Sequence, residues 1–192
     1  MHRLPLLDML RRYSTRYPDE AAVVAQVRQL IENAADCFER TCRPGHVTGS
    51  AWILTQDHTR CLLLHHRKLD CWLQPGGHAD GQAEIEQVAL REAQEESGLT
   101  QLELDGNPED LVPLDIDVHV IPARLDAAGN IAEDRHEHHD IRFLVVASAD
   151  QELVLSEESN DLRWFSCQEV FEVTDEESVL RMMRKAGPHA TG

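Results

Sequence analysis

Three glutamates near the middle of the chain are spaced so that one helix would bring them together. Glu92, Glu95 and Glu96 stand at positions i, i+3 and i+4 of a helix predicted over 83–97, so they share one side of its C-terminal half. Like charges at this spacing destabilise a helix by roughly 0.2–0.5 kcal/mol per pair, and the negative end of the helix dipole adds to the cost. Carboxylates gathered where they repel one another predict a bound cation. The glutamates alone leave a solvated acidic face open as the alternative.

The donor type indicates which cation. Oxygen ligands favour Mg²⁺ or Mn²⁺, which keep several waters and share the oxygens of substrate phosphates. The chain carries a formal net charge of −17, so it would repel a phosphate-bearing substrate at long range, and a bound cation resolves that conflict locally. The same charge argues against binding a nucleic-acid backbone through a general basic surface, which needs clustered Lys and Arg.

A longer pattern surrounds the glutamates. The sequence Trp-Leu-Gln-Pro-Gly-Gly at 72–77 precedes the helix, and Gly98 and Leu99 follow it. The segment resembles the signature of the Nudix hydrolases, G-x5-E-x7-R-E-U-x-E-E-x-G-U with U apolar. It matches at Gly77, Arg91, Glu92, Ala93, Glu95, Glu96, Gly98 and Leu99. With its flanking strands the resemblance covers about 47–185 and leaves an N-terminal arm outside.

One signature position differs. The first glutamate of the pattern falls on Ala83, and Glu84 stands one residue later. One residue rotates a helical side chain by about 100°, so Glu84 is not a simple replacement. In the family this first glutamate supports the metal site, by pairing with the signature arginine or through metal-bound water. Glu84 and Asp80 are the two candidates to compensate for it.

The resemblance implies an α/β/α sandwich with a mixed β-sheet. Glu92, Glu95 and Glu96 would be the metal ligands, with Glu92 a candidate base, and Arg91 would orient the glutamates. Gly77 would let the backbone pass close to the metal or substrate. The implied activity is metal-dependent hydrolysis of a diphosphate linkage in a nucleoside diphosphate derivative or related small molecule.

Three points of the activity stay open. Some family members take the general base from a later loop, where this chain offers Glu133, Glu137, Glu157 and Glu158. A binding or sensor module with a degenerate site, motivated by Ala83, is one alternative function. A diphosphate isomerase on the same fold is another. Release of new phosphate ends separates hydrolysis from both alternatives.

Positive and polar residues outside the helix are candidates for reading the substrate. Arg67 and Lys68 could bind phosphate as a fork and a point charge, with a solvated turn as the alternative. His78 could contact substrate or the metal shell. Arg142 could contact phosphate or ribose, because His138, Asp140 and Arg142 would share one face of a strand. The histidines at 136, 138 and 139 fit no specific zinc spacing, so a polar loop end is preferred over a separate metal site.

The scaffold follows from hydrophobic periodicity. Helices are predicted over 4–13 and 18–40, a hairpin over 47–54 and 61–64, and strands over 114–120 and 141–147. Two capping boxes, Ser166 with Glu169 and Thr174 with Glu177, predict short C-terminal helices. The polar stretch 124–140 is predicted to be a functional or partly ordered loop.

These elements give a domain plan: an N-terminal helical extension over 1–45, a Nudix-like domain over 46–187 and a tail over 188–192. The extension is expected to pack on the domain or to form a homodimer. Five cysteines without a CxxC pair indicate reduced thiols. With no signal peptide and no membrane-spanning run, we expect a soluble cytoplasmic protein that binds no membrane.

Overall fold

The computed structural model describes residues 2–148 and 151–187, and the predicted tail over 188–192 lies outside this part. The element bounds, in chain order, are α1 Leu4–Arg16, η1 Pro18–Glu20, α2 Ala21–Asn33, β1 Gly45–Thr55, β2 Arg60–His66, β3 Cys71–Leu73, β4 Gly76–His78, α3 Ile85–Ser97, β5 Leu102–Leu104, η2 Pro108–Asp110, β6 Asp115–Ile121, β7 Arg124–Leu125, β8 Ile131–Glu133, β9 His136–Ala147, β10 Ser159–Ser166, α4 Cys167–Val173 and α5 Glu177–Lys185.

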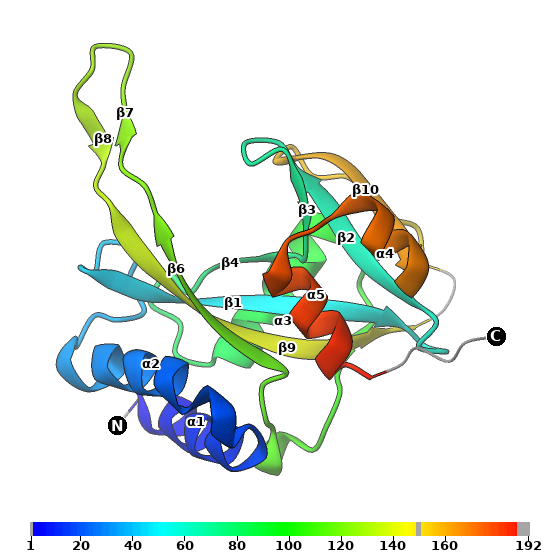
Figure 1. Ribbon diagram of the computed structural model, residues 1–192, viewed down its shortest axis with the longest axis horizontal. Coiled ribbons are helices and arrows are strands. Elements are labelled where there is room, and N and C mark those ends of the chain that lie inside the picture. The colour runs from blue at the N-terminus through cyan, green and yellow to red at the C-terminus, as the bar shows by residue number, and fades with distance from the viewer. Residues whose placement is uncertain (1, 149–150, 188–192) are drawn as a thin grey trace.

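A mixed sheet forms the centre of the molecule (Figure 1). Its main order is β10-β2-β1-β9-β5, with β3 on β2, β4 on β1 and β6 on β9. Strands β1 and β9 run parallel over their whole length, from the pair Gly45 and Glu137 to the pair Thr55 and Ala147, whereas the other pairs are antiparallel. The N-terminal half of β1 pairs with β4, and its C-terminal end pairs with β2. Because β4 contains Gly77, this pairing holds the start of the signature segment against the sheet.

Helices cover both faces of this sheet. Ala51 and Ile53 of β1 belong to a cluster of buried residues that also contains the apolar residues of α1, α2 and α3. Trp52 and Leu54, which point the other way, belong to a second cluster with residues of α4 and α5. Because alternate residues of a strand face opposite sides, the two clusters are the two helix-covered faces. The predicted α/β/α sandwich with a mixed sheet is confirmed.

The N-terminal arm differs from its prediction in length. The helix expected over 18–40 is a 3-10 turn followed by α2, which ends at Asn33. The backbone then folds back, and Cys37 and Phe38 become buried while the Phe38 carbonyl accepts a hydrogen bond from Gly81. A helix continued to residue 40 would carry these two side chains past the core that they fill. The first helix, α1, forms as predicted and runs on to Arg16.

Of the two predicted capping boxes near the C-terminus, one forms and the other does not. Ser166 and Glu169 form the expected reciprocal box at the start of α4. Thr174 forms no such box: its hydroxyl accepts from the Glu176 backbone N–H, and Glu176 is the N-cap of α5. The second helix is present as α5, but its predicted capping box was wrong because the Thr174 side chain binds a backbone group outside the helix.

The stretch 124–140 is more ordered than expected. It contains the small hairpin β7–β8 and then the first residues of β9, and Figure 1 shows it projecting as an arm at the upper left. Asp126 holds the tip, because its carboxylate accepts hydrogen bonds from the backbone of Ala128 and Asn130. Among the described residues, no helix is long and apolar enough to cross a lipid bilayer.

Candidate active site

Helix α3 carries the glutamates, and its buried face fixes their direction. Ile85, Val88, Ala89 and Ala93 pack into the core against β1. The helix ends at Gly98, whose φ of 73° is the left-handed cap that glycine adopts readily, and the Gly98 N–H donates to the Gln94 carbonyl. The glutamates lie around the side of this helix that borders β4.

Strand β4, before the helix, contacts two of the three glutamates. The Gly76 N–H donates to Glu96 Oε2 at 2.8 Å. A Cβ at position 77 would lie 2.4 Å from Glu92 Oε2, so any larger residue there would displace the Glu92 carboxylate from this position. Glu95 is exposed and lies 4.0 Å from Arg91 Nε. The structure thus brings Gly77, Glu92 and Glu96 together, with Glu95 at the solvent side.

The two inner carboxylates, Glu92 and Glu96, are partly buried, and their charges are not fully compensated. Burial raises the pKa of Glu96 to about 7, and Glu92, Glu158 and Glu95 act in the same direction, opposed by the Gly76 N–H. Burial also raises the pKa of Glu92, although its partner Arg91 works against the shift. Among the candidate bases in the later loops, Glu158 lies where its charge raises the pKa of Glu96. A cation between these groups would remove the repulsion.

Arg91 is positioned by a residue that the sequence pattern did not single out. Its guanidinium donates to Glu92 Oε1 at 2.7 Å, to the His78 carbonyl at 2.7 Å and to Gln82 Oε1 at 2.8 Å. Gln82 therefore provides the oxygen that the signature would take from a glutamate at position 83. The helix begins only at Ile85, and the preceding residues form a turn and irregular backbone, so helical spacing does not apply to them.

The two expected substitutes for the missing glutamate make other contacts or lie elsewhere. Asp80 accepts two hydrogen bonds from Arg40, at 2.5 and 2.6 Å. Glu84 is exposed at the N-cap of α3. A polar residue one position before the signature site could have been proposed from the sequence if the helix start had been placed correctly.

The candidate phosphate-binding pair lies on the turn after β2. Arg67 donates through Nη2 to the Ser159 carbonyl and through Nε to Asn160, and its backbone N–H binds the Glu158 carbonyl. The Arg67 side chain therefore joins this turn to the start of β10, next to Glu158. Lys68 is exposed on the same turn.

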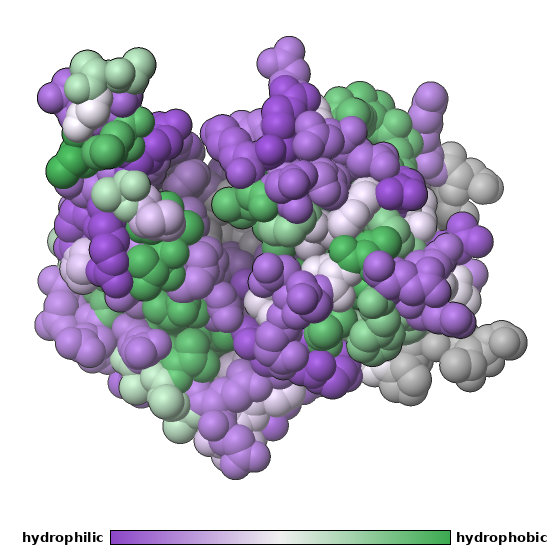
Figure 2. All heavy atoms as spheres, turned by 45° about the horizontal axis from the view of Figure 1, so that its top comes forward, coloured by the Kyte–Doolittle hydropathy of each residue, from purple (hydrophilic) through white to green (hydrophobic). Residues whose placement is uncertain are grey.

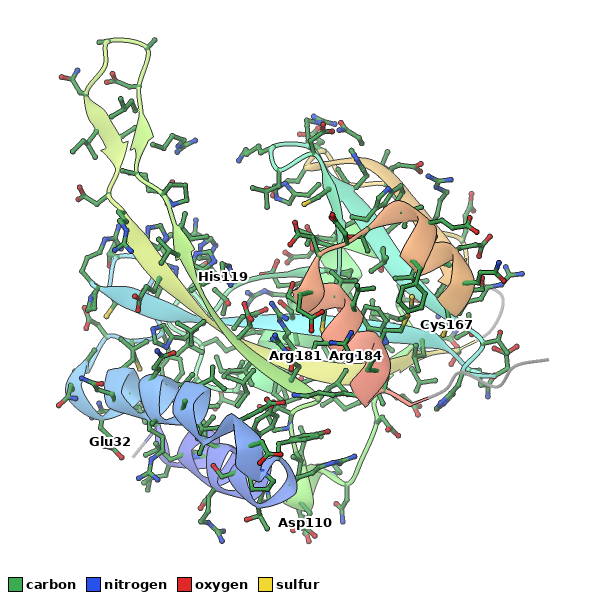
Figure 3. All side chains as sticks on the ribbon, viewed as in Figure 1. Glu32, Asp110, His119, Cys167, Arg181 and Arg184 are labelled. Atoms are coloured by element: carbon green, nitrogen blue, oxygen red, sulfur yellow. The ribbon has the colours of Figure 1, made fainter. Side chains whose placement is uncertain are left out.

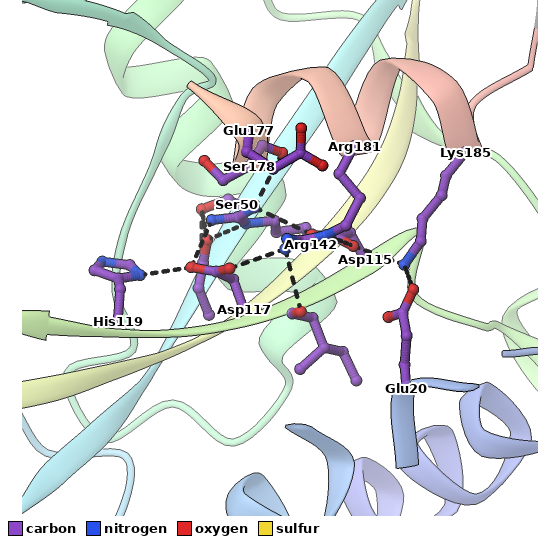
Figure 4. Close-up of polar contacts among 12 residues, drawn as sticks. Glu20, Ser50, Asp115, Asp117, His119, Arg142, Glu177, Ser178, Arg181 and Lys185 are labelled. Carbon is purple, nitrogen blue, oxygen red and sulfur yellow. Dashed lines mark hydrogen bonds and ion pairs between the residues drawn. The ribbon is translucent and has the colours of Figure 1, made fainter. Parts of the chain in front are cut away.

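Arg142 lies inside the protein, and its environment does not support the predicted substrate contact. Its side chain is 3% exposed and pairs with Asp140 at 2.7 Å, Asp115 at 3.1 Å and Asp117 at 3.3 Å. Figure 4 shows the guanidinium beneath α5, surrounded by these interactions. The predicted common face of His138, Asp140 and Arg142 does occur on β9, but α5 covers its Arg142 end.

The acidic partners of Arg142 bind further cations from α5. Arg181 donates to Asp115 and Asp117, and Lys185 bridges Asp115 and Glu20 at 2.7 and 2.6 Å (Figure 4). Burial alone would raise the pKa of Asp115, but the hydrogen bond from Arg181, the charge of Arg142 and the hydrogen bond from Lys185 outweigh it and lower the pKa. The network joins β9, β6, α5 and the N-terminal arm.

The surface near the signature segment is hollowed and hydrophilic. Figure 2 shows a recess between the β7–β8 arm and the lobe that carries β2, β3 and β10, with mostly hydrophilic residues along its walls. A polar recess beside paired carboxylates suits a phosphorylated small molecule better than an apolar ligand.

Comparison with known sequences decides the family. The sequence profile of the NUDIX domain matches residues 45–185. The chain belongs to the Nudix family. Curated proteins include no match to this sequence.

Solved structures agree with the fold. A NUDIX-family hydrolase from Clostridium perfringens is 24% identical, with a TM-score of 0.57 over 73% of this chain and 95% of that chain. The Ap4A hydrolase of C. elegans in a binary complex is 21% identical, with a TM-score of 0.54 over 73% and 93%. The dihydroneopterin triphosphate pyrophosphohydrolase of E. coli is 20% identical, with a TM-score of 0.50 over 74% and 94%. The matched part corresponds to almost the whole of each of these three chains.

Proposed function

We propose that this Nudix protein hydrolyses a diphosphate linkage in a nucleoside diphosphate derivative or a related small molecule, with Mg²⁺ or Mn²⁺ bound by Glu92, Glu95 and Glu96. The observation that supports this most is the approach of the Gly76-Gly77 backbone to the carboxylates of Glu96 and Glu92. The glutamates thereby adjoin the glycine backbone of β4, beside which a phosphate chain can lie.

The donor set fits such a cation. Two partly buried carboxylates and one exposed carboxylate offer only oxygen, which hard divalent ions prefer. Burial is the main cause that raises the pKa values of Glu96 and Glu92, and neighbouring carboxylates, Glu92 beside Glu96 and Glu95 beside Glu92, act in the same direction. A divalent cation would hold both in the ionised state. When bound, it would supply positive charge beside the diphosphate and lower the pKa of a water.

The chain's own residues then have separate tasks. Arg91 holds Glu92 in place and is itself fixed by Gln82 and the His78 carbonyl. As the water oxygen forms a bond to phosphorus, a carboxylate oxygen takes the proton, and the bridging P–O bond breaks with its electron pair on the departing phosphate. Glu92 and Glu158 are the two candidates for this proton acceptor, the latter because its charge acts on Glu96.

Substrate binding is assigned to the rim of the same recess. We propose that exposed Lys68 contacts a phosphate, with Arg67 holding the turn through the Ser159 carbonyl. The Ap4A hydrolase and dihydroneopterin triphosphate pyrophosphohydrolase among the structural neighbours make dinucleoside polyphosphates and triphosphate derivatives the first compounds to test. A cytoplasmic setting is proposed on the buried, reduced Cys37, Cys42 and Cys61.

A screen with the full chain tests the proposal. Dinucleoside polyphosphates, nucleoside diphosphate sugars and nucleoside triphosphates would be incubated with Mg²⁺ and with Mn²⁺, and new phosphate ends measured by chromatography. Hydrolysis predicts metal-dependent release from at least one class. Binding measured without release would favour the sensor module, and rearrangement without release would favour the isomerase.

A further inference from the structure

Five histidines gather at the base of the β7–β8 arm. His138 on β9 is at their centre: the ring centroids of the other four lie between 4.8 and 5.5 Å from its own. These four are His46 on β1, His78 on β4, His119 on β6 and His136 on β9. Figure 3 labels His119, which marks the place of the cluster on β6.

Strand register, rather than loop conformation, places the rings together. His46 is the β1 partner of His138, and His119 is its β6 partner. Thr48, two residues after His46, pairs with His78. Side chains of paired residues share a face, so the histidines stand on the same side as Asp140 and Arg142. The cluster occupies the part of this face near the N-terminal end of β9, whereas α5 contacts the face at Arg142.

Three of the rings are close enough to share one ion. His46, His136 and His138 each offer a nitrogen, and these nitrogens lie within 4.8 Å of one another. Nε2 of His136 lies 3.3 Å from Nε2 of His138. Two imidazole nitrogens on one tetrahedral zinc, each at about 2.0–2.1 Å, are separated by roughly 3.3 Å, so this pair already has the spacing of two ligands.

The hydrogen bonding of His136 also suits a metal ligand. Its Nδ1 lies 2.8 Å from the Asp134 carbonyl. A carbonyl only accepts, so Nδ1 carries a proton, and in the neutral ring the lone pair of Nε2 would face His138. A second-shell carbonyl on the remote ring nitrogen is the usual arrangement of a metal-ligating histidine.

His46 supplies an independent observation. The residue is 1% exposed, and neither of its ring nitrogens makes a hydrogen bond to any residue in the described ranges, although the Cys42 backbone is close enough to favour its charged form. A buried polar group without a partner destabilises the fold, and a bound ion would give this ring a partner.

We propose that His46, His136 and His138 form a second metal site, one that binds a transition-metal ion of the Zn²⁺ class and is separate from the glutamate site. Three imidazoles favour Zn²⁺, Co²⁺, Ni²⁺ or Cu²⁺ over Mg²⁺. The fourth position is open, and His78 is the next ring in reach, 5.1 Å from His138 between centroids. A bound ion would tie β1 to β9 beneath the arm, next to the signature segment that follows Gly77.

Metal titration of the full chain tests this site. After treatment with a chelator, the protein would be titrated with Zn²⁺ by calorimetry and with Co²⁺ by visible absorption. We expect one ion per chain, a Co²⁺ spectrum of a four-coordinate site and a rise in Tm on zinc binding. His138→Gln should weaken Zn²⁺ binding at least tenfold. His138 is only half-buried, so this is the substitution of choice among the three ligands.

Two controls assign the ion. Glu96→Gln removes a carboxylate of the other site and should leave Zn²⁺ affinity unchanged, and His58→Asn changes an exposed histidine at a turn with φ 58°, a conformation that asparagine tolerates. Equal Zn²⁺ affinity in His138→Gln and the parent, or zinc lost in Glu96→Gln alone, would overturn the proposal. If His138→Gln does not fold, X-ray absorption of the zinc-loaded parent decides: about three imidazole ligands support the site, and an oxygen-only shell contradicts it.

Discussion

Single residues decide the chemistry of the signature segment. Glu96 is partly buried, accepts a hydrogen bond from Gly76 and is repelled by neighbouring carboxylates, so the metal-free protein carries a local cost there. Gln82 occupies the place beside Arg91 that the family pattern gives to a glutamate at position 83. The charge of Glu96 and the hydrogen bonding of Arg91 each depend on these neighbours, and a single substitution tests each feature.

Glu96→Gln should stabilise the metal-free protein above neutral pH. The folded-state pKa of Glu96 is about 7, raised from an unfolded value of about 4.3, so its ionisation opposes folding as the pH rises through this window. Glutamine keeps an oxygen for the Gly76 N–H and removes the charge. Thermal unfolding in chelator should show a higher Tm for the variant at about pH 8 and a smaller difference at about pH 5. A Tm advantage independent of pH would contradict the shift.

Gln82→Ala should lower kcat without unfolding the protein. Arg91 would lose one of its three acceptors and hold Glu92 less firmly, and a lost hydrogen bond to a charged group is worth about 1.5–3 kcal/mol. We therefore expect kcat to fall about tenfold or more. Gln87→Ala, at an exposed position of α3, is the control. If the two variants have equal kcat, Gln82 has no role in positioning Arg91.

At the scale of elements, polar groups join the sheet to the helices on one of its faces. Arg142 of β9 pairs with Asp115 and Asp117 of β6, and the same aspartates pair with Arg181 of α5. A buried ion network of this kind is costly to break at one member. It fixes the angle at which α5 lies over β6 and β9, beside the histidine cluster.

Arg142→Met should lower stability much more than substrate affinity. Removing the guanidinium leaves three carboxylates without their shared partner, which costs about 3–5 kcal/mol in buried pairs. Urea unfolding measures this loss. KM, measured at a temperature where both proteins are folded, should stay within about twofold of the parent. A large rise in KM with little loss of stability would restore the substrate contact expected from the sequence.

Asp117→Asn should reduce the decrease in folding stability that accompanies a fall in pH. Burial would raise the pKa of Asp117, but its hydrogen bond with His119, the charge of Arg142 and the hydrogen bond from Arg181 outweigh that effect and lower the pKa. A folded-state pKa below the unfolded value of about 3.9 contributes stability that is present above that pH and lost below it. The difference in free energy of unfolding between parent and variant should therefore shrink from about pH 7 to about pH 3. A constant difference would contradict this assignment.

At the scale of the whole molecule, the N-terminal arm is part of the core. Leu6, Leu10 and Tyr13 of α1 are 0–1% exposed, and Lys185 of α5 contacts both Tyr13 and Glu20. The apolar faces of α1 and α2 thus pack on the same chain, which is the packing role expected of the extension. The homodimer through these helices stays a prediction and would have to use other faces.

Leu10→Ala should destabilise the entire protein if the arm and the Nudix domain share one core. Removing a fully buried leucine side chain costs about 2–5 kcal/mol. Leu4→Ala, at a position that is 58% exposed on the same helix, should change stability by about 0.5 kcal/mol or less. Urea unfolding followed by a probe in the Nudix domain should shift for Leu10→Ala. An unchanged midpoint would mean that the arm unfolds separately.

The sequence predicts those features that local spacing controls. The glutamates follow from helical periodicity, the sheet strands from alternating apolar residues, and the α4 cap from Ser166 and Glu169. The role of Arg142 could not be predicted, because Asp115, Asp117 and Arg181 come from distant segments. His46 was missed because a single histidine carries no spacing signal until strand pairing sets it opposite His138.

The most direct test of the central claim is the kcat/KM of parent and Glu96→Gln on the best substrate of the screen, at saturating Mg²⁺. The account predicts a loss of at least 100-fold, about 2.7 kcal/mol of transition-state stabilisation, together with weaker Mg²⁺ affinity. Glu103→Gln, an exposed glutamate on β5, should match the parent. Equal kcat/KM in Glu96→Gln and the parent would contradict the assignment of Glu92, Glu95 and Glu96 as the catalytic metal site.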